Sequence, residues 1–214
     1  MGIRLPALHV VTHDRTLASD GWLVSAEAVL EAGGTSIALH VRGPGTSGRR
    51  VFDLARHLVP RARRVGAWLI VNDRVDVALA TGADGVHLGR RSLPVAAARG
   101  LLPTGARVGV SVHGPDQVER AGAEGADYAF VGTIFPTPSH EGLPGMGVNG
   151  LRDAAERAGG LPVIAIGGID VGRAVQAIRA GASGAAVLRG VWSAPDPSRA
   201  VGEFVRAIEG AIDG

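Results

Sequence analysis

The sequence predicts an α/β fold in which a single (β/α)8 barrel, or TIM barrel, spans residues 1–214. Short runs of branched aliphatic residues, which are typical of buried parallel strands, alternate along the chain with segments of helical periodicity. No linker or change in composition divides the chain. Eight strand–helix units of about 27 residues each would form a compact version of the ~250-residue barrel.

The aliphatic runs predict eight strands. We expect them at residues 8–12, 37–42, 67–72, 85–88, 108–111, 128–131, 163–166 and 185–188. Helical periodicity is clear at residues 74–81 and 171–180. Three helical segments end at Gly82, Gly125 or Gly181, and a strand follows shortly after each. Glycine just past a helix end closes the helix in the left-handed conformation, so these junctions indicate one repeated unit.

A doubly wound open sheet is the competing architecture. Such a sheet binds dinucleotides through a glycine-rich turn directly after its first strand. Here that position holds Thr12, His13 and Asp14, while a glycine spacing that starts at Gly142 comes late and includes a proline. The sequence therefore favours the closed barrel.

The composition excludes several kinds of chemistry. The chain has no cysteine, and therefore no disulfide, cysteine nucleophile or thiolate metal site. All 22 basic residues are arginine, so no lysine can form a Schiff base or a P-loop. The charges are dispersed and their net value is +2, which gives no reason to expect a nucleic-acid partner. We see no signal peptide or membrane span, and we expect a cytoplasmic enzyme with no membrane partner.

The active site of a (β/α)8 barrel lies at the carboxyl ends of its strands. Polar or glycine residues gather at this end of nearly every predicted strand, with a regularity that random surface polarity would not produce. They are His13, Asp14, His40, Arg42, Asn72, Asp73, His87, Ser111, His113, Thr133, Thr137, Gly167, Gly168, Arg189 and Gly190.

His40 and Arg42 share one face of the second predicted strand, because alternate residues of a strand point the same way. An arginine at the mouth of the barrel suits a phosphate or a carboxylate, which it binds through two parallel hydrogen bonds. If Arg42 faces the mouth, His40 lies one layer below it. A buried core histidine and a chemical role are equally good interpretations of His40.

A phosphate site is predicted after the last two strands. Barrels often bind phosphate with the loops after strands seven and eight. Gly167 and Gly168 follow the seventh strand, and glycine lets backbone N–H groups approach phosphate oxygens closely. Leu188 and Arg189 complete this site at the end of the eighth strand.

Asp73 has two interpretations. It can cap the next helix, or it can bind a magnesium ion together with a second carboxylate. The natural place for that second carboxylate, after the fourth strand, holds Gly89, Arg90, Arg91 and Ser92 and supplies cations instead. We therefore predict no metal site.

Six motifs follow one another in order between Leu8 and Val191. They read VNDRVD (71–76), ADGVHLG (83–89), GVSVH (109–113), ADY (126–128), VGTIFPT (131–137) and PVIAIGGI (162–169). Together they resemble the thiamine phosphate synthase/TenI superfamily. The resemblance implies a TIM barrel that binds a phosphorylated thiazole, and it implies a possible homo-oligomer.

The superfamily has a synthase branch and a TenI-like branch. The departures of this chain from the synthase pattern favour the TenI-like branch. Synthases join a pyrimidine pyrophosphate to thiazole phosphate with Mg²⁺, and Asn72, Asp73, Ser111 and Thr137 match their pattern. The synthase glutamine and lysine of strand two are replaced by His40 and Pro44. A glutamine and a magnesium-binding aspartate after strand four are replaced by Arg90 and Ser92. A lysine after strand six is replaced by His140 or a neighbour.

The resemblance therefore predicts a TenI-like thiazole tautomerase that moves a proton on a thiazole carboxylate phosphate. Thr133 matches the histidine proposed as the proton shuttle of that branch, so a different histidine must act. His40 is our first choice, with His113 and His140 next. Arg42 would hold the carboxylate, and Gly147 belongs to a loop that resembles the TenI-like one. No cofactor is expected.

Two alternatives remain open. The first is a thiamine phosphate synthase that requires Mg²⁺. The second is a non-catalytic regulatory paralogue that binds thiazole phosphate. Thr133 keeps the second alternative open, because threonine does not titrate near neutral pH.

Overall fold

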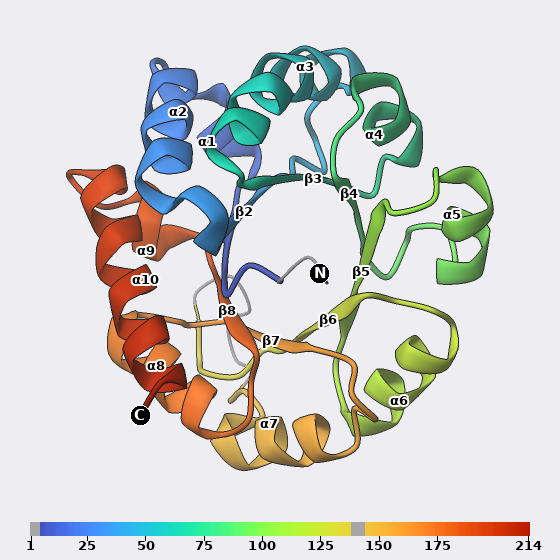
Figure 1. The fold of residues 1–214 in the computed structure, drawn as a ribbon, viewed down its shortest axis with the longest axis vertical. Coiled ribbons are helices and arrows are strands. Elements are labelled where there is room, and N and C mark those ends of the chain that lie inside the picture. Colours follow the sequence, from blue (N-terminus) through green and yellow to red (C-terminus); the bar gives the residue numbers. More distant parts are fainter. Residues whose placement is uncertain (1–4, 138–143) are drawn as a thin grey trace.

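The computed structural model describes residues 5–137 and 144–214, and it confirms the closed barrel. Eight parallel strands follow one another around the barrel in sequence order, and β1 closes the circle against β8 (Figure 1). The strands are β1 (Leu8–Val11), β2 (Ile37–Val41), β3 (Trp68–Asn72), β4 (Gly85–Leu88), β5 (Arg107–Val112), β6 (Tyr128–Val131), β7 (Val163–Ile166) and β8 (Gly184–Val187).

All eight predicted strands are present, and their ends differ from the prediction by at most one residue. β5 is longer at both ends, because Arg107 pairs with Gly85 and Val112 pairs with Val131. β1 ends before Thr12, whose hydroxyl instead bonds the backbone of the β2 end. Pairing between neighbouring strands determines where these strands begin and end, and the local sequence does not encode that pairing.

A ring of helices surrounds the strands (Figure 1). The helices are α1 (Asp14–Ala18), α2 (Trp22–Gly33), α3 (Gly48–Val65), α4 (Val75–Thr81), α5 (Val95–Leu101), α6 (Pro115–Ala123), α7 (Gly147–Glu156), α8 (Val171–Arg179), α9 (Arg189–Trp192) and α10 (Pro197–Ile212). The long α10 packs on α2 and α8, so the end of the chain covers the seam where β8 meets β1. No helix within the described ranges is long and apolar enough to cross a membrane.

The predicted glycine junctions are confirmed. Gly82, Gly125 and Gly181 have φ angles of 66°, 88° and 97°, in the left-handed region that favours glycine. Each follows or ends a helix directly before the next strand. The glycines therefore turn the chain from the outer ring back into the barrel wall.

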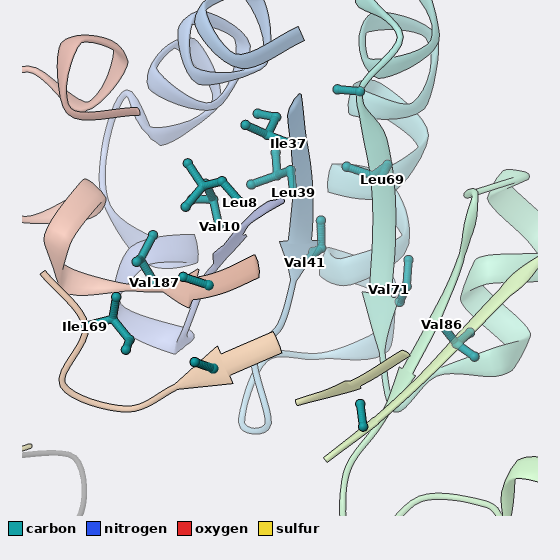
Figure 2. Close-up of a cluster of buried hydrophobic side chains, with 14 of the residues drawn as sticks. Leu8, Val10, Ile37, Leu39, Val41, Leu69, Val71, Val86, Ile169 and Val187 are labelled. Carbon is teal, nitrogen blue, oxygen red and sulfur yellow. The ribbon is translucent and has the colours of Figure 1, made fainter. Parts of the chain in front are cut away.

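The strands divide the apolar residues into two cores. Outward side chains such as Leu8, Val10, Leu39 and Val71 pack against the helices in one large cluster (Figure 2). Inward side chains alternate with them and fill the barrel itself, as the two-residue period of a strand requires. Polar inward residues at the carboxyl ends of the strands therefore line the mouth of the barrel.

Candidate active site at the mouth of the barrel

The mouth has two sides that differ in their chemistry. We call one the β2–β4 side and the other the β6–β8 side. The β2–β4 side comprises Arg42, Asn72, Asp73, Gly89, Arg90, Arg91 and Ser92. The β6–β8 side comprises Thr133, Thr137, Gly167, Gly168, Leu188 and Arg189.

Asp73 connects β3 to the loop that follows β4. Its Oδ1 accepts hydrogen bonds from the backbone N–H of Gly89, at 3.0 Å, and from the hydroxyl of Ser92. Arg74 is the residue at the helix start, and no side chain caps α4. The helix-cap interpretation of Asp73 is therefore wrong, because its carboxylate faces the β4 loop. Asp73 has a φ of 64°, an uncommon conformation for a residue other than glycine.

Arg42 directly follows β2 and is partly exposed. The carboxylate of Asp14, the first residue of α1, accepts hydrogen bonds from Gly45 N–H and from the hydroxyl of Thr46. The Thr46 hydroxyl is the main cause that lowers the pKa of Asp14, and the charge of Arg42 contributes. Asp14 therefore stays charged and orders the loop after β2.

Ser111 and His113 lie at the end of β5. The hydroxyl of Ser111 is 2.8 Å from Nε2 of the buried His87. The exposed His113 donates from Nδ1 to the carbonyl oxygen of Gly132, at 2.8 Å. The structure describes two of the three predicted catalytic histidines, His40 and His113. Of these two, only His113 is exposed.

Backbone and glycine form most of the β6–β8 side. Gly167 and Gly168 have φ angles of 101° and 66°, and a Cβ on Gly168 would lie 2.7 Å from the carbonyl oxygen of Pro136. Arg173 fixes this turn by donating to the Gly168 carbonyl at 2.8 Å. Within the described residues, the N–H groups of Gly168 and Leu188 donate to no backbone carbonyl. They are available to an anion.

Arg189 crosses from the β8 end to the β6 loop. Its Nη2 is 3.3 Å from the hydroxyl of Thr137, so both residues belong to one side of the mouth. Gly147 begins α7, has a φ of 69°, and donates its N–H to the carbonyl of Ile134. His140 lies outside the described residues.

Five rings pack against one another inside the barrel. They belong to His9, His40, His87, Tyr128 and Phe130. His40 is fully buried, one layer below the strand end that carries Arg42, as the strand parity predicted. Burial lowers the pKa of His40 to about 3, while its hydrogen bond with Asn72 acts in the opposite direction. His40 is therefore neutral at neutral pH and does not face the mouth, so its geometry favours the core-histidine interpretation over proton transfer.

A family model described as thiamine monophosphate synthase matches residues 8–191. The chain belongs to this family. A thiamine-phosphate synthase of Salinispora arenicola is 40% identical over 206 residues, which cover 95% of this chain and 98% of that protein. One from Chlorobium phaeovibrioides is 44% identical over 178 residues and covers 83% and 84%. The solved structure of a thiamine phosphate pyrophosphorylase from Pyrococcus furiosus superposes with a TM-score of 0.84 at 33% identity, over 97% of both chains.

These relatives overturn the tautomerase prediction. Proteins of this family that are about 40% identical over nearly the whole chain are named synthases, which are transferases and not isomerases. The prediction failed because it treated the lost lysines and the lost aspartate as lost function. Yet four arginines, Arg42, Arg90, Arg91 and Arg189, follow strand ends of the barrel. A guanidinium neutralises phosphate charge as a lysine does.

Several contacts near the mouth were missed from the sequence. Asp14 was a candidate for the mouth, but the sequence did not show that Asp14 and Thr12 order the loop after β2. Arg173, which holds the Gly168 turn, and His9, an inward residue of β1 that bonds to His40, were not predicted at all. Of these last two, only His9 gave a signal, because a histidine at an inward position of a buried strand is unusual. The other contacts join residues from different loops.

Proposed function

We propose that this protein is a thiamine-phosphate synthase that joins a pyrimidine diphosphate to a thiazole phosphate. The identity of about 40% to proteins of that name, over nearly the whole chain, carries the proposal. The reaction breaks the bond between a pyrimidine methylene carbon and the diphosphate, and the new bond joins that carbon to the thiazole ring nitrogen. The site must therefore hold two anions and neutralise the charge of the leaving diphosphate.

The β6–β8 side suits the thiazole phosphate. The available N–H groups of Gly168 and Leu188 supply neutral donors, and Arg189 adds a charge beside Thr137. Because both glycines have positive φ angles, the backbone can approach phosphate oxygens where a side chain would interfere. A monophosphate needs only a small cradle of this kind.

The β2–β4 side suits the diphosphate. Arg42 supplies a guanidinium that can bind two oxygens at once. Asn72 supplies an amide, and Arg90 and Arg91 lie in the exposed loop after β4. This side thus offers more charge than the β6–β8 side, as the larger charge of a diphosphate requires.

The residues beside Asp73 fit a magnesium ion that arrives with the diphosphate. No cluster of three metal-ligating side chains occurs within residues 5–137 and 144–214. Magnesium, however, typically uses one or two carboxylates together with substrate phosphates and water. Hydrogen bonds from Gly89 and Ser92 occupy Oδ1 of Asp73, and Oδ2 carries none in the described part of the chain. Asp73 would hold the ion, and bound magnesium would neutralise charge on the leaving diphosphate.

Direct product analysis tests the proposal. Purified protein is mixed with both substrates and magnesium, and phosphorus NMR follows the release of diphosphate while chromatography detects thiamine phosphate. We expect both products in equal amounts, and we expect chelation of magnesium to stop their formation. A protein that binds thiazole phosphate but forms no thiamine phosphate would contradict the synthase proposal.

A phosphorylated thiazole is thus the proposed small-molecule partner. A cytoplasmic location and a homo-oligomeric state both remain predictions. Gel filtration with light scattering would test the second of these.

A further inference from the structure

A chain of hydrogen bonds runs through the barrel interior to the mouth. Nδ1 of His9 is 2.9 Å from Nε2 of His40, and Nδ1 of His40 is 3.1 Å from Oδ1 of Asn72. His9 and His40 are fully buried, and Asn72 is only 8% exposed. The chain therefore connects two side chains that substrate cannot reach with one that lies at the β2–β4 side.

The atoms in this chain fix its direction. Because Oδ1 of Asn72 can only accept, Nδ1 of His40 must carry a proton. A neutral imidazole has one N–H, so Nε2 of His40 is an acceptor and Nδ1 of His9 must donate to it. The opposite direction would need the Asn72 amide turned around and a proton on Nε2 of His9, an atom that is buried and has no hydrogen-bond partner within the described residues.

The observed direction has a consequence at the mouth. With its carbonyl oxygen held from below, Asn72 presents its NH2 group outward as a donor. Anionic oxygens need donors at this position, and an Asn72 amide turned around would present an acceptor that repels them. Burial keeps His40 neutral, so the donor on its Nδ1 does not depend on pH near neutrality.

We infer that His9 and His40 are positioning residues that hold the Asn72 amide as a hydrogen-bond donor toward the diphosphate of the pyrimidine substrate. This inference rests on the proposed function. Neither histidine touches substrate in this arrangement. His40 acts through Asn72, and His9 acts through His40 by fixing its tautomer.

The first test compares three variants of the full-length protein. His40→Leu removes the donor to Asn72, whereas His40→Asn restores a nitrogen close to the Nδ1 position. We expect His40→Leu to raise the KM for the pyrimidine diphosphate about tenfold or more, with the KM for thiazole phosphate within about twofold of wild type. His40→Asn should recover most of this loss. Phe130→Leu is the control, because Phe130 packs on His40 without a polar contact.

A double variant makes the test specific to the amide. In an Asn72→Ala background, His40→Leu should cause no further rise in the KM for the diphosphate substrate, because the group that it positions is gone. Equal effects of His40→Leu in both backgrounds would overturn the inference. So would a His40→Asn variant as impaired as His40→Leu, or a Phe130→Leu variant with the same KM change.

A second measurement does not depend on turnover. Long-range proton–nitrogen NMR correlations of the histidine rings report which nitrogen carries the proton. We expect protons on Nδ1 and bare Nε2 atoms in both His9 and His40. Protons on Nε2 would overturn the inference. A wild-type protein that makes no thiamine phosphate would instead contradict the proposed function, and the tautomers alone would then decide the direction of the chain.

Discussion

The two sides of the mouth, which we propose as two anion sites, are built by different means. The β6–β8 side uses backbone N–H groups in a turn of two glycines, which Arg173 and Thr133 surround closely. The β2–β4 side uses side chains, whose positions depend on contacts between loops, such as that of Asp73 with Ser92. A site made of backbone tolerates little change of sequence, while a site made of charged side chains can exchange one cation for another. Under the proposed function, this difference accounts for a diphosphate site in a chain without lysine.

The largest expected effect comes from Asp73, on the β2–β4 side. Asp73→Asn keeps an oxygen that can accept from Gly89 and Ser92 but removes the negative charge. We expect kcat/KM for thiamine phosphate formation to fall about 100-fold or more, because magnesium binds much less tightly to an amide. Steady-state kinetics at several magnesium concentrations would measure this. Asp76→Asn, on the exposed face of α4, is the control and should keep wild-type activity.

Most of the fold could be predicted from the sequence, because the strands and their glycine junctions are local patterns. The composition of the β6–β8 side followed for the same reason, since Gly167 and Gly168 are adjacent in the chain. The contact of Asp73 with Ser92 could not be predicted, because it joins loops that only barrel closure brings together. Strand parity placed His40 one layer below Arg42, but its role was undecided, because its contacts with Asn72 and His9 come from other strands.

A substitution at Gly168 tests the β6–β8 side. Gly168→Ala places a Cβ 2.7 Å from the carbonyl of Pro136 at a φ of 66°, so the turn must shift. We expect a rise of about tenfold or more in the KM for thiazole phosphate, and a loss of ~1–3 kcal/mol in stability. The control is Gly172→Ala in α8, where the nearest atom would be 3.6 Å away. Equal effects of the two substitutions on KM would contradict the assignment of this turn to phosphate.

Substitutions at Arg42 test whether a positive charge alone is sufficient to bind the diphosphate substrate on the β2–β4 side. Arg42→Ala should raise the KM for the diphosphate substrate about tenfold, and Arg42→Lys should recover part of this loss, because lysine restores the charge but not the two parallel hydrogen bonds. Initial rates over a range of diphosphate concentrations would measure both variants. Full recovery by lysine would show that the site needs a charge only. No recovery would show that the paired geometry decides binding.

Ser92 gives the smallest expected effect. Ser92→Asp adds a second carboxylate beside Asp73, where magnesium could use both. We expect the magnesium concentration for half-maximal rate to fall about threefold, with little change in kcat at saturation. A magnesium titration of the initial rate would measure it. An increased magnesium requirement would mean that repulsion between the two carboxylates outweighs the added ligand.

The division of the mouth into two anion sites can be tested directly by NMR. Backbone amide shifts are followed while thiazole phosphate alone, or inorganic diphosphate with magnesium, is added to the wild-type protein. Thiazole phosphate should shift the amides of Gly167, Gly168, Leu188 and Arg189, and diphosphate should shift those of Arg42, Asp73, Gly89 and Ser92. Perturbation of the same set of amides by both ligands would contradict the division.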